Sequence, residues 1–338
     1  MKGVVLAGGS GTRLHPLTAT TTKQLLPVAN RPILFYVLDD LVRAGITDLA
    51  LIVAPTTGAE VRKRVGDGSL WGAGTRITYV VQDRPAGIAH AVLATREFVG
   101  ADPFCVFLGD CLVGSGVGQA ASSFQSSSDL DALVMLKEVA DPHGFGVAVV
   151  DDRGDVVRLV EKPPEPPSNL AIVGVYFLRA SIFDAIDAIT PSPRGELELT
   201  DALAKLVERK ARVGAHHVEG WWVDAGSREH LLLANEKVLA DRLVPAIEGE
   251  ISADSTLSGP VRVEPGARIL RSTLVGPLVV GRNARIEDSR IGPFTSVGDG
   301  CTVLRSSVER SILLGGARVD DEPCVVRAIL DRSSRLDG

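Results

Sequence analysis

The sequence has few aromatic residues, few cysteines and no long apolar run. Aromatic residues make up 4% of the 338 residues. The cysteines (Cys105, Cys111, Cys301 and Cys324) show neither a CxxC spacing nor a compact disulfide framework, so we expect reduced, buried thiols in a cytoplasmic protein. Apolar runs such as 49–54 are far shorter than the roughly 18 residues that a membrane span needs. The apolar stretch at the N-terminus is too short for a signal peptide.

An excess of basic residues is also absent. The chain has 36 Lys and Arg against 42 Asp and Glu, a net charge of −6. This balance argues against a dedicated nucleic-acid surface, so a polyanionic ligand would have to be held by a local cationic site. We expect neither a nucleic acid nor a membrane as partner. At roughly 150 residues per domain, the length suggests two domains.

Strand and helix signals alternate over the first 240 residues. Continuous apolar runs, typical of buried strands, occur at 3–7, 49–54, 77–81, 104–108, 132–136, 146–150, 156–160 and 172–178. Helices are predicted from Pro32 to Gly45 and at 182–189, 199–210 and 229–239. The alternation predicts an α/β domain over 1–242, with a Rossmann-like mixed, mostly parallel sheet and helices on both faces.

A different pattern begins near residue 248. Apolar residues recur at intervals of five or six, with Gly, Pro, Asn and Asp at many of the positions between them: Val263, Ile269, Leu274, Val280, Ile286, Ile291, Val297, Val303, Val308, Leu313 and Val319. This period is typical of hexapeptide repeats, in which each short strand contributes one inward side chain. We predict a small C-terminal left-handed parallel β-helix over 243–338. The alternative is an ordinary run of short antiparallel strands.

A glycine-rich loop, GGSGTR at 8–13, directly follows the first predicted strand. Its backbone N–H groups could approach an anion closely, and Arg13 and Lys23 add the positive charge that a triphosphate requires. It is not a Rossmann fingerprint, because Leu14 takes the third glycine position, and no Gly-Lys-Ser/Thr follows as in a Walker A loop. The alternative is a turn with two solvated cations.

With Arg13 and Lys23 included, the segments GGSGTRL and KQLLP resemble the signature of sugar nucleotidyltransferases. Further segments resemble that family in the same order along nearly the whole chain: LGD at 108–110, EKP at 161–163, SPRGELE at 192–198 and WVDAG at 222–226. The resemblance is greatest to long-form members that transfer a thymidylyl group. It implies in-line attack of glucose 1-phosphate on dTTP, giving dTDP-glucose and pyrophosphate, with Mg²⁺ as cofactor and a homo-oligomeric assembly.

The resemblance also implies roles for individual residues. Arg13, Lys23 and Asp110 would be catalytic, and Asp110 and Asp224 would hold Mg²⁺, which prefers carboxylate oxygens. The nucleotide would be bound by Leu6, Gly8, Gly9, Ser10, Gly11, Thr12, Arg13, Gln24, Gln82 and Gly87. The sugar phosphate would be bound by Gly146, Glu161, Lys162, Asn169, Val173 and Arg194. Cys111 departs from the family, which usually has Asn after the first Asp.

Several alternatives stay open. Uracil shares the imide edge of thymine and lacks only a methyl group, so transfer from UTP, or dual use, is compatible with the motifs. A second alternative is a non-catalytic paralogue that binds nucleotide sugars. At the level of single residues, Glu161 and Lys162 could form only a surface ion pair, and Gln82 could be only a polar residue at the end of a strand. An acyltransferase β-helix is not favoured, because 251–338 contains no histidine. The six histidines show no metal-ligand spacing, and we interpret them as structural or surface residues.

Overall fold

The computed structural model describes residues 1–9, 11–19 and 21–334. The chain divides into two compact units, one formed by Met1–Leu25 with Ile33–Asp224 and the other by Leu26–Pro32 with Ala225–Gly338. Within the described part of the chain, every helix is too short or too polar to cross a bilayer. Each unit is described separately below.

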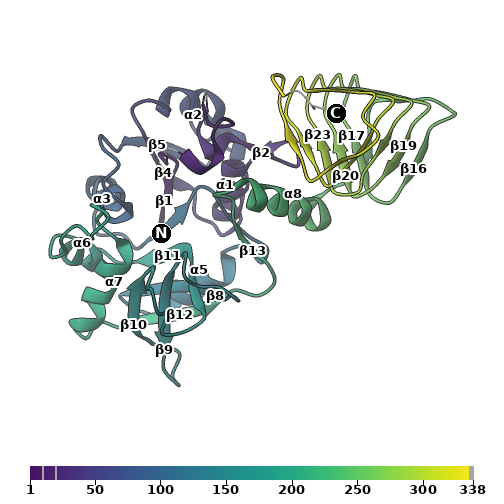
Figure 1. Cartoon of the computed structure of the whole chain (residues 1–338). Helices are drawn as coiled ribbons and strands as arrows, with labels where there is room; N and C mark the ends of the chain where they lie inside the picture. The colour runs from purple at the N-terminus through teal and green to yellow at the C-terminus, as the bar shows by residue number, and fades with distance from the viewer. Residues whose placement is uncertain (10, 20, 335–338) are drawn as a thin grey trace. The chain divides into compact units, whose positions relative to one another are not determined.

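The first unit is built on a mixed sheet with the order β10-β9-β11-β6-β1-β4-β5, in which β8 also pairs with β11, and β12 with β8 (Figure 1). Its strands are β1 (Lys2–Leu6), β4 (Asp48–Val53), β5 (Arg76–Val81), β6 (Phe104–Leu108), β8 (Ala132–Glu138), β9 (Gly146–Val150), β10 (Val156–Glu161), β11 (Leu170–Leu178) and β12 (Val213–His217). Strands β6, β1, β4 and β5 run parallel. Strand β11 is antiparallel to its neighbours β6, β8 and β9. The predicted mixed α/β sheet is therefore confirmed. Four adjacent strands, β6, β1, β4 and β5, form its main parallel part, and β12 is parallel to β8.

Helices cover both faces of this sheet. They are α1 (Ile33–Arg43), α2 (Gly58–Val65), α3 (Ile88–Leu93), α4 (Arg96–Val99), α5 (Gly118–Ser126), α6 (Ser181–Ile186) and α7 (Leu199–Glu208), with 3-10 turns η1 (Thr12–Leu14), η2 (Lys23–Leu25) and η3 (Ser69–Trp71). One apolar core lies under α1, α2 and α5, and another lies under α3, α6 and α7. In α1, the residues Leu34, Val37, Leu38 and Leu41 are all fully buried. The i, i+3, i+4, i+7 pattern in the sequence thus marked the face that packs on the sheet.

Two three-residue strands pair at a distance in sequence. Strand β7 (Cys111–Val113) pairs antiparallel with β13 (Trp222–Asp224), so that Asp224 lies opposite Cys111. Neither strand is long enough to give a periodic signal, and neither was predicted from the sequence. Their pairing matters because it brings the LGD and WVDAG segments together.

The second unit contains the hairpin β2 (Pro27–Val28) and β3 (Arg31–Pro32), the helix α8 (Arg228–Arg242) and a parallel β-helix. One wall of the β-helix consists of β14 (Ala246–Ile247), β17 (Val261–Val263), β20 (Leu278–Val280), β23 (Thr295–Val297), β26 (Ile312–Leu313) and β29 (Ile329–Leu330). A second wall consists of β15 (Glu250–Ile251), β18 (Arg268–Leu270), β21 (Arg285–Glu287), β24 (Thr302–Leu304) and β27 (Arg318–Asp320). The third wall consists of β16 (Thr256–Ser258), β19 (Thr273–Val275), β22 (Arg290–Ile291), β25 (Ser307–Glu309) and β28 (Val325–Val326).

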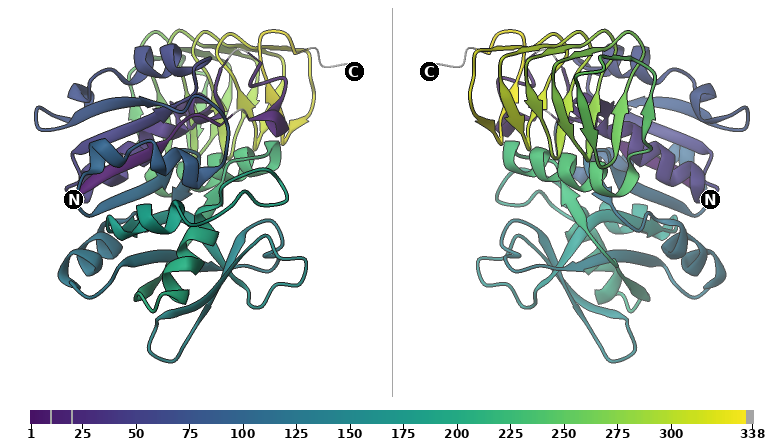
Figure 2. Two further views of the ribbon diagram at one scale, coloured as in Figure 1. Left: turned by 90° about the vertical axis from the view of Figure 1, so that its left-hand side faces the viewer. Right: turned by 90° about the vertical axis from the view of Figure 1, so that its right-hand side faces the viewer.

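The coils of the β-helix stack in chain order (Figure 2). Ile269 pairs with Ile286, seventeen residues later, and every strand pair within the three walls is parallel. All eleven apolar residues that define the five- and six-residue spacing lie in one buried core. The predicted left-handed β-helix is confirmed, and the antiparallel alternative is wrong.

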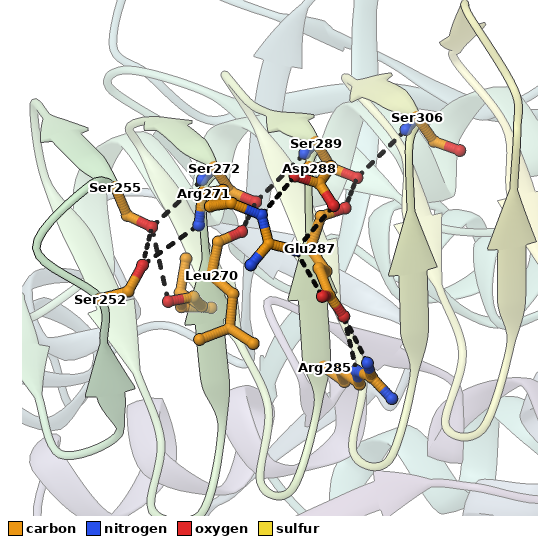
Figure 3. A network of polar contacts seen from close by, with 11 residues as sticks. Ser252, Ser255, Leu270, Arg271, Ser272, Arg285, Glu287, Asp288, Ser289 and Ser306 are labelled. Carbon is orange, nitrogen blue, oxygen red and sulfur yellow. Dashed lines mark hydrogen bonds and ion pairs between the residues drawn. The ribbon is translucent and has the colours of Figure 1, made fainter.

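A ladder of serines runs along one corner of the β-helix (Figure 3). The backbone N–H of Ser289 donates to Ser272 Oγ, and that of Ser306 donates to Ser289 Oγ, each at 3.1 Å. Each hydroxyl in turn donates to the carbonyl two residues before it, as Ser289 Oγ does to Glu287 O at 2.7 Å. Because buried backbone groups need partners, this ladder satisfies donors where the chain turns between walls.

Charged residues alternate in sign beside the serine ladder, at equivalent corners of successive coils: Asp254, Arg271, Asp288, Arg305 and Asp321. Arg271 Nε lies 2.7 Å from Asp288 Oδ1, and Arg305 Nε lies 2.5 Å from Asp321 Oδ1 (Figure 3 shows the first pair). The pKa of the Asp288 carboxyl is lowered by the hydrogen bonds from Arg271 and also by the charge of Arg305. Each inner member of the series thus lies between two opposite charges.

Candidate active site

The glycine-rich loop begins where β1 ends and lies close to β4. A Cβ atom on Gly8 would lie 3.0 Å from the backbone nitrogen of Ala54, so no larger residue fits there without displacement. Gly11 has a φ of +61°, and its carbonyl accepts a hydrogen bond from Thr18 Oγ1 at 2.9 Å. Thr12 and Arg13 follow in η1, and the Arg13 side chain is exposed. Ser10, which was predicted to bind nucleotide, lies outside the described residues.

Lys23 and Gln24 turn back toward this loop from η2. A Cβ atom on Gly9 would lie 3.0 Å from Lys23 Cε and 3.4 Å from Gln24 Nε2, so the glycine leaves room for both side chains. Gln24 is buried, and its Oε1 accepts a hydrogen bond from the Thr22 hydroxyl. Lys23 and Gln24 therefore lie directly against Gly9 of the glycine-rich loop.

Lys23 forms an ion pair with Asp110, which is only 5% exposed. Burial by itself would lower the pKa of Lys23, but the charge of Asp110, its hydrogen bond and the more distant charge of Asp224 outweigh burial and raise it. Lys23 is therefore a fixed cation at neutral pH. Its charge is held at the edge of the glycine-rich loop.

Asp110, Cys111 and Asp224 gather around the end of β6. One ligand atom from each residue lies within 4.8 Å of the others. The β7–β13 pairing creates this cluster from residues 114 positions apart. Burial, together with the charges of Asp224 and Asp110, raises the pKa of the Cys111 thiol well above its usual range, so the thiol is neutral. Two carboxylates with an adjacent neutral thiol suit a hard cation held through oxygen.

Gly174 accounts for the close approach of β11 to this cluster. Its φ is +79°, and the register of β11 on β8 shifts between Ile172 and Tyr176. A Cβ atom at this position would lie 3.0 Å from Cys111 Sγ and 2.7 Å from Leu108 Cδ1. The bulge in β11 therefore depends on glycine. Val173, predicted to contact the sugar, points its side chain into the apolar core, so only its backbone could do so.

The predicted sugar-phosphate residues form a second group. Glu161 Oε1 accepts a hydrogen bond from Arg194 at 3.2 Å and lies 3.9 Å from Lys162 Nζ. Glu161 Oε2 accepts a hydrogen bond from Thr200 Oγ1 at 2.7 Å, and a Cβ atom on Gly146 would lie 2.9 Å from the same oxygen. The structure thus brings together Gly146, Glu161, Lys162 and Arg194. Asn169 instead donates to Glu138 Oε1 at 2.7 Å, at an exposed position.

Two partners of this group were missed in the sequence. Thr200 holds Glu161, and Glu198, only 3% exposed, accepts a hydrogen bond from Arg194 at 2.7 Å. Ser192 Oγ also donates to Glu198, at 2.9 Å. The hydrogen bond to Glu198, its charge and the charge of Glu161 together outweigh burial and raise the pKa of Arg194. The sequence signal that could have identified this support was a Glu directly before the predicted amphipathic helix at 199–210.

An aromatic contact joins the two groups. The ring of Phe145, next to Gly146, meets the ring of Trp222 edge-on at a centroid distance of 5.0 Å. Trp222 precedes Asp224 on β13. The hairpin that carries the sugar-side glycine is therefore packed against the strand that carries the second carboxylate, since such aromatic pairs are favourable beyond their buried area.

Gln82 and Gly87 form the remaining predicted part. Gln82 directly follows β5, and its Nε2 lies 3.2 Å from Gly87 O and 3.1 Å from His90 Nδ1. Gly87 has a φ of +99° and a Cβ there would lie 2.4 Å from Leu197 O. The loop is thus held against the chain that leads from Arg194 into α7.

Taken together, a glycine-rich loop after the first strand, paired carboxylates at the end of a parallel strand and several fixed cations define an α/β protein that binds phosphorylated substrates. The family described as nucleotidyl transferase matches residues 2–241. The chain belongs to this family, as its motifs predicted.

Individual relatives agree with this assignment. The chain is 47% identical to a glucose-1-phosphate thymidylyltransferase of Streptomyces antibioticus over 336 residues, which cover 99% of this chain and 93% of that protein. A crystal structure described as a glucose-1-phosphate thymidylyltransferase from Bacillus anthracis in complex with a sucrose is 35% identical, with a TM-score of 0.66 over 73% of this chain and 97% of that one. A crystal structure of a UDP-glucose pyrophosphorylase complexed with UDP-glucose is 27% identical, with a TM-score of 0.64 over 71% of this chain and 99% of that one.

Proposed function

We propose that the protein transfers a thymidylyl group from dTTP to α-D-glucose 1-phosphate, giving dTDP-glucose and pyrophosphate. The observation that carries this proposal is the contact of Lys23 with Asp110 beside the glycine-rich loop. Identity of 47% over nearly the whole length of a glucose-1-phosphate thymidylyltransferase supports the choice of substrates.

The reaction joins two anions, so positioning and charge are what the protein must supply. An oxygen of the sugar phosphate attacks the α-phosphorus in line. As the new P–O bond forms, the bond from the α-phosphorus to the bridging oxygen breaks, and pyrophosphate leaves. A phosphate monoester is a competent nucleophile near neutral pH, so no general base is required. Arg13 and Lys23 would offset the charge on the leaving pyrophosphate.

The sugar phosphate would be held by the second group of residues. The contacts of Arg194 with Glu161, Glu196 and Glu198 are all made through Nη2. We expect the remaining N–H groups of this guanidinium to donate to the sugar phosphate, since Arg is well suited to phosphate recognition. Lys162 adds a second cation, and Glu161 would accept hydrogen bonds from sugar hydroxyls.

We further propose that Asp110 and Asp224 hold Mg²⁺. Their carboxylate oxygens lie within 4.8 Å of each other and suit a hard cation, whereas the neighbouring Cys111 thiol does not. Bound Mg²⁺ would neutralise phosphate charge at the reacting centre. The chain itself orients the two carboxylates through the β7–β13 pairing and keeps Lys23 beside the first of them.

Uridylyl transfer is a second candidate, favoured by the likeness to the UDP-glucose pyrophosphorylase. The test is pyrophosphate release from glucose 1-phosphate and Mg²⁺ with dTTP, UTP, ATP, GTP and CTP in parallel. We expect release with dTTP well above the others. Equal rates with UTP would remove the thymidylyl preference and keep the chemistry. An absence of release with all five nucleotides, together with tight binding of dTDP-glucose, would instead identify a non-catalytic binding protein.

A further inference from the structure

The side chain of His90 is in contact with a residue of the proposed nucleotide site. His90 lies on α3, and its Nδ1 is 3.1 Å from Nε2 of Gln82. The His90 side chain is 18% exposed, and its other ring nitrogen lies 4.0 Å from Asp83 Oδ1. This histidine was interpreted from the sequence as structural or surface, because its spacing to the other histidines fits no metal site. The contact with Gln82 instead places His90 beside the proposed nucleotide site.

The hydrogen bonds around Gln82 determine which way its amide faces. Gly87 O lies 3.2 Å from the amide and can only accept, so the atom facing it must be Nε2 and not Oε1. The second proton of Nε2 then points at His90 Nδ1. That nitrogen must therefore carry a lone pair, which assigns His90 the neutral tautomer protonated on Nε2, the nitrogen nearer Asp83.

The frame that holds this arrangement is rigid. Leu197 N donates to Ala86 O at 2.9 Å, and Ala89 N donates to Leu197 O at 3.0 Å. A Cβ atom on Gly87 would lie 2.4 Å from the same Leu197 oxygen, so the loop cannot relax around a larger residue. The carbonyl of Gly87 and the ring of His90 are therefore presented to Gln82 from one fixed turn and the helix that follows it.

We infer that His90 is a positioning residue for nucleobase recognition. It fixes the orientation of the Gln82 amide so that Oε1 alone faces the base. This inference rests on the proposed function. With both amide protons of Gln82 engaged, the base must donate to Oε1. Thymine and uracil carry such a donor at N3, and guanine carries one at N1. Cytosine N3 and adenine N1 carry lone pairs, so the contact disfavours these bases in the pose that places the ring nitrogen against Oε1.

The experiment compares His90→Leu with His90→Asn, whose side-chain oxygen can occupy the place of Nδ1. His217→Leu, at an exposed position on β12, is the matched control. Steady-state kinetics with dTTP and dCTP are measured for the wild type and each variant, and dTTP binding is measured by calorimetry without the sugar. Thermal unfolding shows that each variant is folded.

In His90→Leu, we expect KM for dTTP to rise about tenfold, because the unrestrained amide can turn Nε2 toward the base. We expect kcat and KM for glucose 1-phosphate to change less than about threefold, and the preference for dTTP over dCTP to fall about tenfold. His90→Asn should restore most of that preference.

Two results would overturn the inference: an unchanged dTTP preference in His90→Leu, or equal losses in the Leu and Asn variants. If the wild type turns over no nucleotide, the proposed function fails. The calorimetric dTTP affinities of the same variants then still decide the role of His90.

Discussion

The side chain of Asn235 on α8 accepts a hydrogen bond from the backbone N–H of Ala29, 206 residues earlier, at 2.9 Å. The same Oδ1 accepts a bond from Ser296 Oγ at 2.6 Å, and Nδ2 donates to Phe294 O at 3.1 Å. Asn235 is only 1% exposed. One buried amide thus joins the hairpin 26–32, helix α8 and the β-helix into one unit.

We expect Asn235→Ala to lower the free energy of unfolding by about 2–4 kcal/mol, because it removes the hydrogen-bond partner of one buried hydroxyl and two part-buried backbone groups. Ser296→Ala removes only one donor and should cost less, about 1–2 kcal/mol. Urea unfolding of both variants and the wild type measures the order. Equal costs for the two variants would show that Asn235 is not the centre of this contact.

Substitution of either residue of the Lys23–Asp110 ion pair should lower turnover far more than substitution of a surface ion pair does. Lys23→Met and Asp110→Asn should each lower the rate of pyrophosphate release by 10² to 10³, or about 3–4 kcal/mol of transition-state stabilisation. The control is Lys205→Met, which removes an exposed ion pair with Glu208 on α7. A loss below about tenfold in either site variant would contradict the assigned roles.

The serine ladder predicts that removal of a single ladder hydroxyl lowers the stability of the protein, whereas removal of an exposed serine hydroxyl does not. Ser289→Ala should lower the free energy of unfolding by about 1–3 kcal/mol, since the buried N–H of Ser306 loses its acceptor. Ser258→Ala, at an exposed position of β16, should change it by less than about 0.5 kcal/mol. Chemical denaturation compares the two, and a similar effect of both would show that the ladder contributes little.

Burial raises the pKa values of the Cys105, Cys111 and Cys301 thiols above the ordinary value of 9.0. In the unfolded chain these thiols lose protons as the pH passes 9, whereas in the folded chain they keep them. The unfolded state then binds fewer protons, so stability falls as pH rises through that range. We expect a lower free energy of unfolding at pH 9.5 than at pH 7.5, and a smaller drop in Cys105→Val.

The same burial predicts which thiol reacts. Cys324 is exposed, whereas the other three cysteines are buried. Iodoacetamide at pH 8 should modify Cys324 in the native protein and all four cysteines after denaturation, as peptide mass spectrometry would show. Native modification of Cys111 would mean that its surroundings are open to solvent.

Local periodicity explains which parts of the fold could be predicted. Residues such as Val280 and Ile286 face inward because the chain turns every five or six residues, so their burial can be predicted from the local spacing of apolar residues. The pairing of Cys111 with Asp224 depends instead on two strands of three residues that are stable only next to each other. No local pattern can reveal such a pair.

In the candidate site, too, residues in local motifs could be predicted from the sequence, and residues defined by spatial neighbours could not. Motifs identified Lys23, Asp110 and Glu161, because each stands in a recognisable segment. Thr200 and His90 were missed as site residues because their roles come from neighbours in space. Likewise, the hairpin 26–32 follows Lys23 and Gln24 in the chain but packs with the second unit. Sequence order gives no hint of this.

The alternating corner charges limit how the β-helix can change its length. Removing one coil, for example residues 272–288, would bring Arg271 next to Arg305, and adding one coil would likewise place two like charges at neighbouring corners. Removing or adding two coils preserves the alternation. Insertions and deletions in this domain should therefore be tolerated in steps of about 34 residues, twice the seventeen-residue offset between paired strands, rather than in steps of one coil.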